Sequence, residues 1–263
     1  MPGHLSAHNF SHATRIHARI GQLLDLPRIP LLHGEPGGRS GLFGTHLHMS
    51  VPTHVLYLHG FRSSPMSAKA RFLAAWFAKH HPDMVWCCPQ LPASPKASAQ
   101  LITDLVKDWP HQQMCVIGSS LGGFYATWVA AQWRCKAILL NPAVHPARDL
   151  ARYIGEHPVW QNPDDHIFFD ASFIDELKNL YVGDGLAWLP NPTAATAAPD
   201  ATDMLAVIAT GDEVLDWQEM SKRYANVQRH IIQGSDHGLS DFEAIWPELL
   251  GFVFPSMSIQ DQS

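Results

Sequence analysis

Short apolar runs alternate with amphipathic segments from Val51 to the end of the chain. The runs have the length and apolar character of buried strands, and they cover residues 55–58, 84–88, 114–117, 136–140, 204–209 and 228–232. The segments between and after them predict helices over residues 68–80, 98–109, 124–131 and 241–252. Strands that alternate with helices imply a doubly wound, mostly parallel sheet of about six strands, with helices on both faces.

This alternation breaks between residues 145 and 203, which are rich in proline and show no clear strand. Short helices are expected over residues 147–154 and 174–180, and residues 194–199 read as a loose surface linker. Long loops in compact domains are often functional, so we expect a small cap-like insertion over the carboxyl edge of the sheet. The alternative is a long structural connection that does not contact substrate.

The two ends of the chain differ from its middle. Residues 1–50 are rich in histidine, carry no helical or strand period, and include a Gly/Pro/Ser-rich stretch over 34–41. This composition favours a disordered extension, or a true translation start at Met49, and a metal-binding tail is the alternative. We therefore expect one α/β domain over residues 51–255, followed by a short tail over 256–263.

Residues 118–122 read Gly-Ser-Ser-Leu-Gly, between a predicted strand and a predicted helix. A serine at the centre of Gly-x-Ser-x-Gly in this position is the nucleophile elbow of an α/β-hydrolase. The glycines relieve the clash of side chains that flank so tight a turn. Centring the pattern on Ser119 would put Ile117 and Leu121 where glycines are needed, so the predicted nucleophile is Ser120.

A serine hydroxyl needs a base, and the base is usually a histidine oriented by a carboxylate. In this fold the three residues follow the order serine, aspartate or glutamate, histidine, each on a loop after a strand. Asp212 follows the predicted strand 204–209, and His237 follows the strand 228–232. Asp216 lies where the next helix should start, and we expect it to cap that helix.

The oxyanion formed during ester attack needs backbone N–H donors. The expected donors are Leu121, directly after the nucleophile, and Phe61, in the loop after the first strand. In that loop we expect Gly60 to adopt an unusual backbone angle and His59 to be structural. Arg62 is a candidate for binding an anionic substrate group at the mouth of the site, and the alternative is a solvated surface arginine.

Charge and composition argue against several kinds of binding partner and indicate the state of the cysteines. The formal net charge of −6 argues against nucleic acid or an anionic membrane as the main partner. No apolar run approaches the roughly 20 residues that cross a bilayer, and no signal peptide is evident at the N-terminus. Adjacent Cys87 and Cys88 would point to opposite faces of a strand. All four cysteines are therefore expected to be free thiols in a reducing cytosol.

Several segments together resemble the YqiA-like bacterial esterases, a branch of the α/β-hydrolase superfamily. They are residues 56–61, 63–65, 67–70, 89–92, 118–123, 141–144 and 210–216. The resemblance implies carboxylic ester hydrolysis, a cytoplasmic location and no cofactor. It also assigns Ser120 as nucleophile, Asp212 as carboxylate and His237 as base. Residues 1–50 have no counterpart in the family pattern, and residues 155–202 match it weakly.

These patterns together predict a serine-nucleophile hydrolase of small or short-chain carboxylic esters. Its partner is a small-molecule ester, and neither nucleic acid, membrane nor metal is expected to take part. An acyl-CoA thioesterase is the alternative within the same chemistry. A catalytically silent binding protein is the alternative from another class, although such proteins usually lose a member of the triad and this chain keeps candidates for all three.

Overall fold

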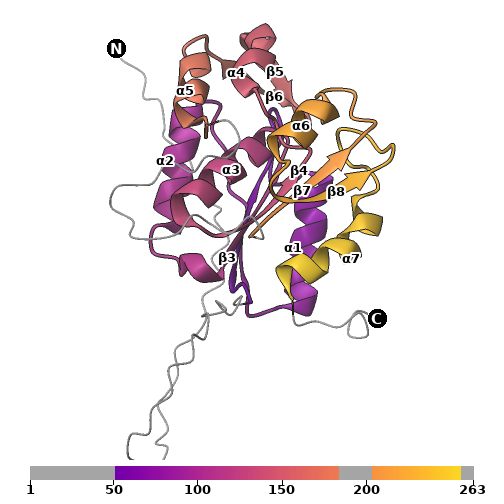
Figure 1. The fold of residues 1–263 in the computed structure, drawn as a ribbon. Helices are drawn as coiled ribbons and strands as arrows, with labels where there is room; N and C mark the ends of the chain where they lie inside the picture. Colours follow the sequence, from indigo (N-terminus) through magenta and orange to yellow (C-terminus); the bar gives the residue numbers. More distant parts are fainter. Residues whose placement is uncertain (1–50, 184–202, 256–263) are drawn as a thin grey trace, which may run out of the picture. The chain divides into compact units, whose positions relative to one another are not determined.

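The computed structural model describes residues 51–183 and 203–255, which all lie within one compact unit, Leu47–Ser263. Six parallel strands form its sheet in the order β2-β1-β3-β4-β7-β8 (Figure 1). They are β1 (His54–Leu58), β2 (Val85–Cys87), β3 (Met114–Ser119), β4 (Lys136–Leu140), β7 (Met204–Ala209) and β8 (Gln228–Ile232). The prediction of a parallel sheet of about six strands is confirmed.

Helices cover both faces of the sheet. Successive side chains of a strand point to opposite faces, so each buried strand packs against helices on both sides. Val55 and Tyr57 of β1 pack toward α1 (Ala68–His80) and α7 (Phe242–Val253). Leu56 and Leu58 pack toward α2 (Pro95–Val106), α3 (Leu121–Trp133) and α6 (Trp217–Arg223). Figure 1 shows α1 and α7 side by side on one side of the sheet.

The helix predicted over 98–109 is shifted: α2 begins three residues earlier and ends at Val106. Its start follows a capping signal, because the Ser94 hydroxyl accepts a hydrogen bond from the Ala97 N–H and Pro95 occupies the first helical position. A short 3₁₀ turn, His111–Gln113, then leads into β3.

The segment after β4 contains strands, so the expectation of none between residues 145 and 203 is wrong. Strands β5 (Gly155–Val159) and β6 (Asn162–Phe169) form an antiparallel hairpin. Most of β6 is exposed and carries Asn, Pro and Asp, which are depleted in strands, so the sequence shows no apolar alternation. Buried Phe169 anchors the hairpin by packing edge-to-face on Phe61 and Phe173.

Helices complete this insertion on either side of the hairpin. Before it come α4 (Pro146–Asp149) and a 3₁₀ turn, Ala151–Tyr153, where a single helix over 147–154 was expected. After it comes α5 (Phe173–Leu180), close to the predicted bounds. The linker predicted over 194–199, the N-terminal extension and the C-terminal tail lie outside the described residues.

The four cysteines are unpaired. Cys87 packs against one side of the core and Cys88 against the other, as expected for neighbours on a strand. Burial raises the pKa of the Cys115 and Cys88 thiols to about 12, which makes both poor nucleophiles.

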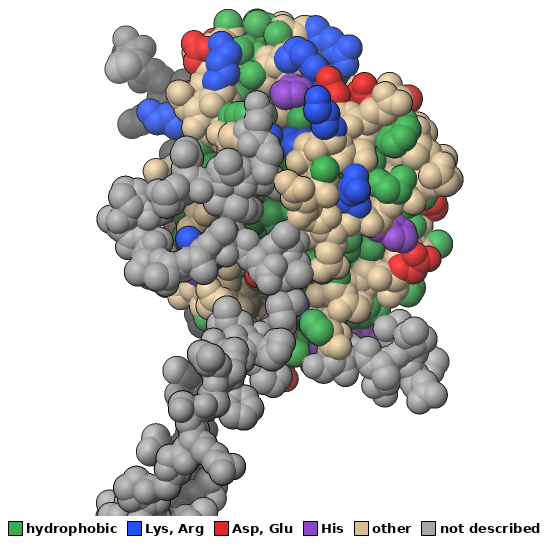
Figure 2. Space-filling view, viewed as in Figure 1, with side chains coloured by type: hydrophobic (Ala, Val, Ile, Leu, Met, Phe, Trp, Pro, Cys, Tyr) green, Lys and Arg blue, Asp and Glu red, His purple; other side chains and the backbone are tan. Residues whose placement is uncertain are grey.

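Basic and acidic side chains are interspersed over the face of the molecule drawn in Figure 2. Among the ion pairs of the described residues, Arg148 pairs with Asp149 and with Glu219, each at 2.7 Å. Among the residues coloured in that view, this face offers no continuous basic surface of the kind that binds a phosphate backbone. Within residues 51–183 and 203–255, no helix has the length and hydropathy of a membrane span.

Asn141, directly after β4, ties the carboxyl ends of the sheet together. Its side chain is fully buried and its φ is 42°, a conformation that asparagine tolerates better than most residues. The side-chain oxygen accepts a hydrogen bond from the Ala209 N–H at 2.8 Å. The amide nitrogen donates to the carbonyl oxygens of Asp236 and His237, each at 3.1 Å.

Replacing Asn141 by alanine should lower the free energy of unfolding by about 3 kcal/mol, because three backbone groups lose their partner. Urea denaturation followed by circular dichroism measures the change. Asn179→Ala, on the exposed surface of α5, is the control and should change stability by less than about 0.5 kcal/mol. Equal effects of the two substitutions would contradict the role given to Asn141.

Candidate active site

Ser120 lies at the junction of β3 and α3 with a φ of 56° and a ψ of −119°. Such a backbone conformation costs about 1–3 kcal/mol and persists only where the surroundings hold it. The Ser120 N–H donates to the Leu140 carbonyl at 2.9 Å, and the Ser120 carbonyl accepts from the N–H groups of Gly123 and Ala143 at 2.9 and 3.0 Å. The turn therefore lifts the hydroxyl above the carboxyl edge of the sheet.

The two glycines of the elbow are required by close approach. A Cβ atom on Gly118 would overlap the Gly122 carbonyl, and one on Gly122 would overlap the Leu58 carbonyl. Both obstacles are backbone atoms, which cannot rotate away as a side chain can. The elbow expected from the sequence is confirmed as a strand–turn–helix unit with these contacts.

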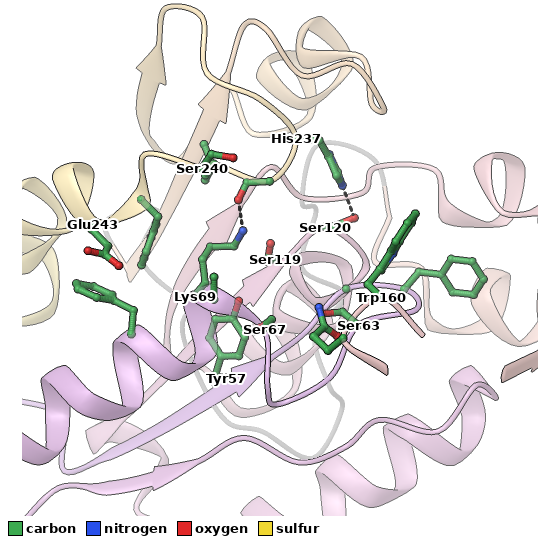
Figure 3. A pocket seen from close by; sticks show the side chains of 18 residues that line it. Tyr57, Ser63, Ser67, Lys69, Ser119, Ser120, Trp160, His237, Ser240 and Glu243 are labelled. Atoms are coloured by element: carbon green, nitrogen blue, oxygen red, sulfur yellow. Dashed lines mark hydrogen bonds between the residues drawn. The ribbon is translucent and has the colours of Figure 1, made fainter. Parts of the chain in front are cut away.

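The structure brings together the three side chains that the sequence singled out (Figure 3 shows the first pair). His237 Nε2 lies 3.0 Å from Ser120 Oγ, and His237 Nδ1 lies 2.8 Å from Asp212 Oδ2. The Asp212 side chain is fully buried and that of His237 is 20% exposed. A buried carboxylate, an imidazole and a hydroxyl thus form one hydrogen-bonded chain that ends at the solvent.

Asp212 and Asp216 have different partners. One oxygen of Asp212 accepts hydrogen bonds from the N–H groups of Val214 and Leu215, both at 2.8 Å, while the other faces His237. Asp216 accepts from the Gln218 N–H at 2.8 Å and is the N-cap of α6. The prediction that Asp216 caps a helix is confirmed.

The loop after β1 faces Ser120. His59 is structural, as predicted: Nε2 accepts from the Leu91 N–H at 3.0 Å and Nδ1 lies 2.9 Å from the Gly60 carbonyl. Burial lowers the pKa of His59, which favours the neutral ring. The reason given for Gly60 was wrong, because its φ is not positive; a Cβ there would crowd the Ser120 Cβ at 3.3 Å.

The two N–H groups expected to hold an oxyanion make no backbone hydrogen bond among the described residues. Leu121 is the first residue of α3, so its N–H has no partner inside the helix. Among the residues that the structure describes, neither the Leu121 N–H nor the Phe61 N–H is paired with a carbonyl. Phe61 itself lies against buried Phe169 of the insertion, which fixes the loop that carries it.

Arg62 binds the hairpin of the insertion. It has a φ of 59°, its Nε donates to the Pro158 carbonyl at 2.9 Å, and its guanidinium lies 4.0 Å from the centre of the Trp160 ring. The Trp160 N–H donates to the Arg62 carbonyl at 2.8 Å. Binding of an anionic substrate by Arg62 stays a prediction, and these contacts give the residue a role in holding the insertion.

Two cavities open beside Ser120, and Trp160, at the turn of the hairpin, lines both. The first, which we call the Lys69 cavity, has a volume of about 400 Å³ and lies between α1 and the loop that carries His237. The second, the cap cavity, has a volume of about 290 Å³ and is lined mainly by the insertion and by Leu121 and Leu215. Both are lined by Ser120 and His237 as well.

Sequence reasoning missed three residues of this site. Lys69 lines the Lys69 cavity, Trp160 lines both cavities, and Glu213 accepts a hydrogen bond from the His237 N–H at 3.0 Å. Glu213 is adjacent to Asp212, and Lys69 lies in a segment that carries the family resemblance. Both therefore fall within motifs that the sequence showed, but the motifs assign them no role. Trp160 gave no signal because the hairpin itself was not recognised.

No group of three or more His, Cys, Asp or Glu side chains in the described parts of the chain could hold a metal ion. His157, a histidine of the insertion, has its Nε2 atom 2.8 Å from the Tyr153 carbonyl and takes no part in the Ser120 chain of hydrogen bonds. The histidine-rich segment 1–50 is not among the residues described.

Residues 54–254 match the family described as an uncharacterised protein family, UPF0227. The chain belongs to UPF0227. That family match spans the whole sheet, the insertion and the loops that carry Ser120, Asp212 and His237.

Solved structures show the fold of this UPF0227 protein. A putative hydrolase from Agrobacterium vitis S4 aligns with a TM-score of 0.57 at 15% identity, covering 78% of this chain and 91% of the other. The metagenome-derived lipolytic enzymes LipS and LipT give 0.52 at 18%, covering 76% and 92%. Est1E from Butyrivibrio proteoclasticus, with ferulic acid bound, gives 0.52 at 15%, covering 80% and 92%. The chain therefore has the α/β-hydrolase fold.

The elbow of this UPF0227 protein permits a paired test on two helical glycines. Gly122→Ala should lower the melting temperature by several degrees, because the added methyl meets backbone that cannot yield. Gly251→Ala is the control, since a Cβ there meets nothing within 4 Å, and it should keep or raise the melting temperature. Differential scanning calorimetry compares them, and a neutral Gly122→Ala would contradict the described packing.

Proposed function

We propose that this protein hydrolyses carboxylic esters through a serine nucleophile. The observation that carries the proposal is the hydrogen-bonded chain from Ser120 through His237 to buried Asp212, raised above the carboxyl edge of the sheet by a strained turn. Open α/β sheets keep their active sites at this edge. The α/β-hydrolase fold is shared with lipolytic enzymes, which is consistent with this reaction class.

In the proposed mechanism, His237 Nε2 takes the proton of the Ser120 hydroxyl as Oγ attacks the ester carbonyl carbon. Asp212 holds the imidazole in the tautomer that leaves Nε2 free to accept, and it stabilises the imidazolium that forms. His237 then returns the proton to the leaving alcohol, and the acyl group stays on Ser120. A water molecule, deprotonated by His237, releases the acid and restores the hydroxyl.

The unpaired N–H groups of Leu121 and Phe61 form the proposed oxyanion hole. Donors fixed before the reaction lower the barrier without reorganising, and one such donor is typically worth about 3 kcal/mol. Leu121 also stands at the first turn of α3, where the helix dipole favours negative charge. These two N–H groups come from the same loops that the sequence indicated.

The cap cavity is the proposed acyl site. Its walls are mainly apolar, and its volume of about 290 Å³ suits a small or short-chain acyl group. The resemblance to YqiA-like esterases supports a cytoplasmic location, and four unpaired cysteines fit a reducing compartment.

A fluorophosphonate probe should label Ser120 and not its neighbour Ser119, because only Ser120 lies within hydrogen-bond distance of His237. Intact mass and peptide mapping locate the adduct. Ser120→Ala should abolish labelling and lower kcat by about a millionfold, as triad deletions do elsewhere. An adduct on Ser119, or unlabelled protein that still turns over esters, would overturn the assignment.

The two aspartates near β7 should respond differently to the same substitution. Asp212→Asn should leave the fold intact and lower kcat roughly 10⁴-fold, because the amide no longer selects the reactive tautomer of His237. Asp216→Asn should change kcat and melting temperature little, since asparagine caps a helix about as well. An inactive Asp216→Asn with an active Asp212→Asn would show that the third member of the triad is misassigned.

Esters and thioesters of one short-chain acid separate the esterase from an acyl-CoA thioesterase. The proposed function predicts turnover of the oxygen ester of a simple alcohol that depends on Ser120. Turnover of the coenzyme A thioester alone would favour the thioesterase. A correctly folded protein that hydrolyses neither and takes up no fluorophosphonate would favour a silent binding protein.

A further inference from the structure

Lys69 reaches into the cavity beside the nucleophile from the first turn of α1. Figure 3 shows its side chain rising between Tyr57 and the loop of His237, on the opposite side of Ser120 from Trp160. The first turn of α1 carries no acidic side chain, and the positive end of the helix dipole adds to the ammonium charge. Lys69 therefore places a positive charge on this side of the site.

The positive charge of the Lys69 ammonium is not neutralised by a neighbouring carboxylate in the described part of the chain. Its Nζ donates to the Gly238 carbonyl, which leaves two of its three hydrogens for other acceptors. In the part of the chain that the structure describes, no carboxylate lies within ion-pair distance of it. Burial lowers the pKa of Lys69, and the more distant Asp236 carboxylate partly opposes that shift.

Neither acidic group near the cavity, Asp236 or Glu243, forms an ion pair with Lys69. Both Asp236 oxygens are engaged by Ser240, one with its N–H at 2.8 Å and one with its hydroxyl at 2.5 Å. Glu243 is exposed at the rim of the cavity. Lys69 is half-buried and has no carboxylate in contact, so an anion that enters the cavity would gain a charge partner there.

Hydroxyl groups line the same cavity near the ammonium. Tyr57 is fully buried, and its hydroxyl lies near those of Ser67 and Ser119. The Ser67 hydroxyl is buried and makes no hydrogen bond of ordinary geometry. Ser67 lines the cavity at the start of α1, and its side chain does not cap the helix.

We propose that the Lys69 cavity binds a carboxylate group of the substrate, so that the preferred substrates are anionic esters. The inference rests on the proposed function, because it places the anion beside the ester attacked by Ser120. One ammonium with neighbouring hydroxyls balances the single negative charge of a carboxylate. Arg62 does not line this cavity; it is held by the hairpin.

The carboxylate can belong to either half of the ester. On the acyl side the substrate is a half-ester of a dicarboxylic acid, and on the alcohol side it is an ester of a hydroxy acid. Ser120 and His237 line both cavities, so either half can enter the Lys69 cavity while the other enters the cap cavity. The shared chemistry is a carboxylate held at a distance from the scissile bond.

The test compares matched ester pairs in the full-length protein. Para-nitrophenyl hemiglutarate against para-nitrophenyl pentanoate probes the acyl side, and para-carboxyphenyl butyrate against para-carbamoylphenyl butyrate probes the alcohol side. The wild-type protein should favour the anionic member of one pair by roughly 10-fold or more in kcat/KM, as a charge-assisted hydrogen bond does. In Lys69→Met that ratio should fall to about 1.

Matched variants separate charge recognition from a structural role. Lys79→Met, at the exposed end of the same helix, should keep the wild-type ratio. Lys69→Arg should keep part of the preference. If Lys69→Met lowers both members of each pair by the same factor, Lys69 only positions the His237 loop through Gly238, and the inference is wrong. It is also wrong if the wild-type protein shows no preference in either pair.

Binding to Ser120→Ala separates this inference from the proposed function. Calorimetric titration of that variant with para-nitrophenyl hemiglutarate and para-carboxyphenyl butyrate needs no turnover. At least one should bind, and a further Lys69→Met substitution should weaken its binding roughly 10-fold. Lys69-dependent binding in a protein that hydrolyses no ester would overturn only the hydrolase. Ester turnover without Lys69-dependent binding or selectivity would overturn only the carboxylate site.

Discussion

The geometry of the candidate site depends on how closely α3 approaches the first and third strands. Gly118 and Gly122 remove the two Cβ atoms that would hold the helix away. The backbone can then place Ser120 in its strained conformation, with the hydroxyl above the sheet and the Leu121 N–H beside it. A larger residue at either glycine would shift Ser120 and the proposed oxyanion hole together.

The other parts of the site are loops that the parallel sheet brings to one edge. Asp212 follows β7 and His237 follows β8, and neither strand positions its loop alone. Buried Asn141, at the end of β4, binds β7 and the loop of His237 at once. Glu213 adds a second hydrogen bond to the His237 N–H. The loop that carries His237 is therefore held in place by residues that follow β4 and β7.

The sequence predicted the sheet well because each strand is a short apolar run between polar turns. It also indicated which residues would meet at the carboxyl edge, since the order of parallel strands and loops constrains them. The hairpin of the insertion was missed because β6 is polar and exposed, and its register depends on contacts such as Phe61 with Phe169. Lys69 was given no role because the cavity that it lines is formed by residues far apart in the sequence, which no local pattern records. Gly60 was expected to adopt an unusual backbone angle, whereas in the structure its small size is what the close approach of Ser120 requires.

The hairpin and the loop after β1 are joined by two hydrogen bonds at one residue. Arg62 accepts from the Trp160 N–H and donates to the Pro158 carbonyl, and Phe61 directly precedes it. The hairpin therefore cannot swing outward as a rigid body without breaking both bonds or pulling the Phe61 N–H with it. Any displacement of the hairpin that keeps both bonds would therefore also move one of the two donors of the proposed oxyanion hole.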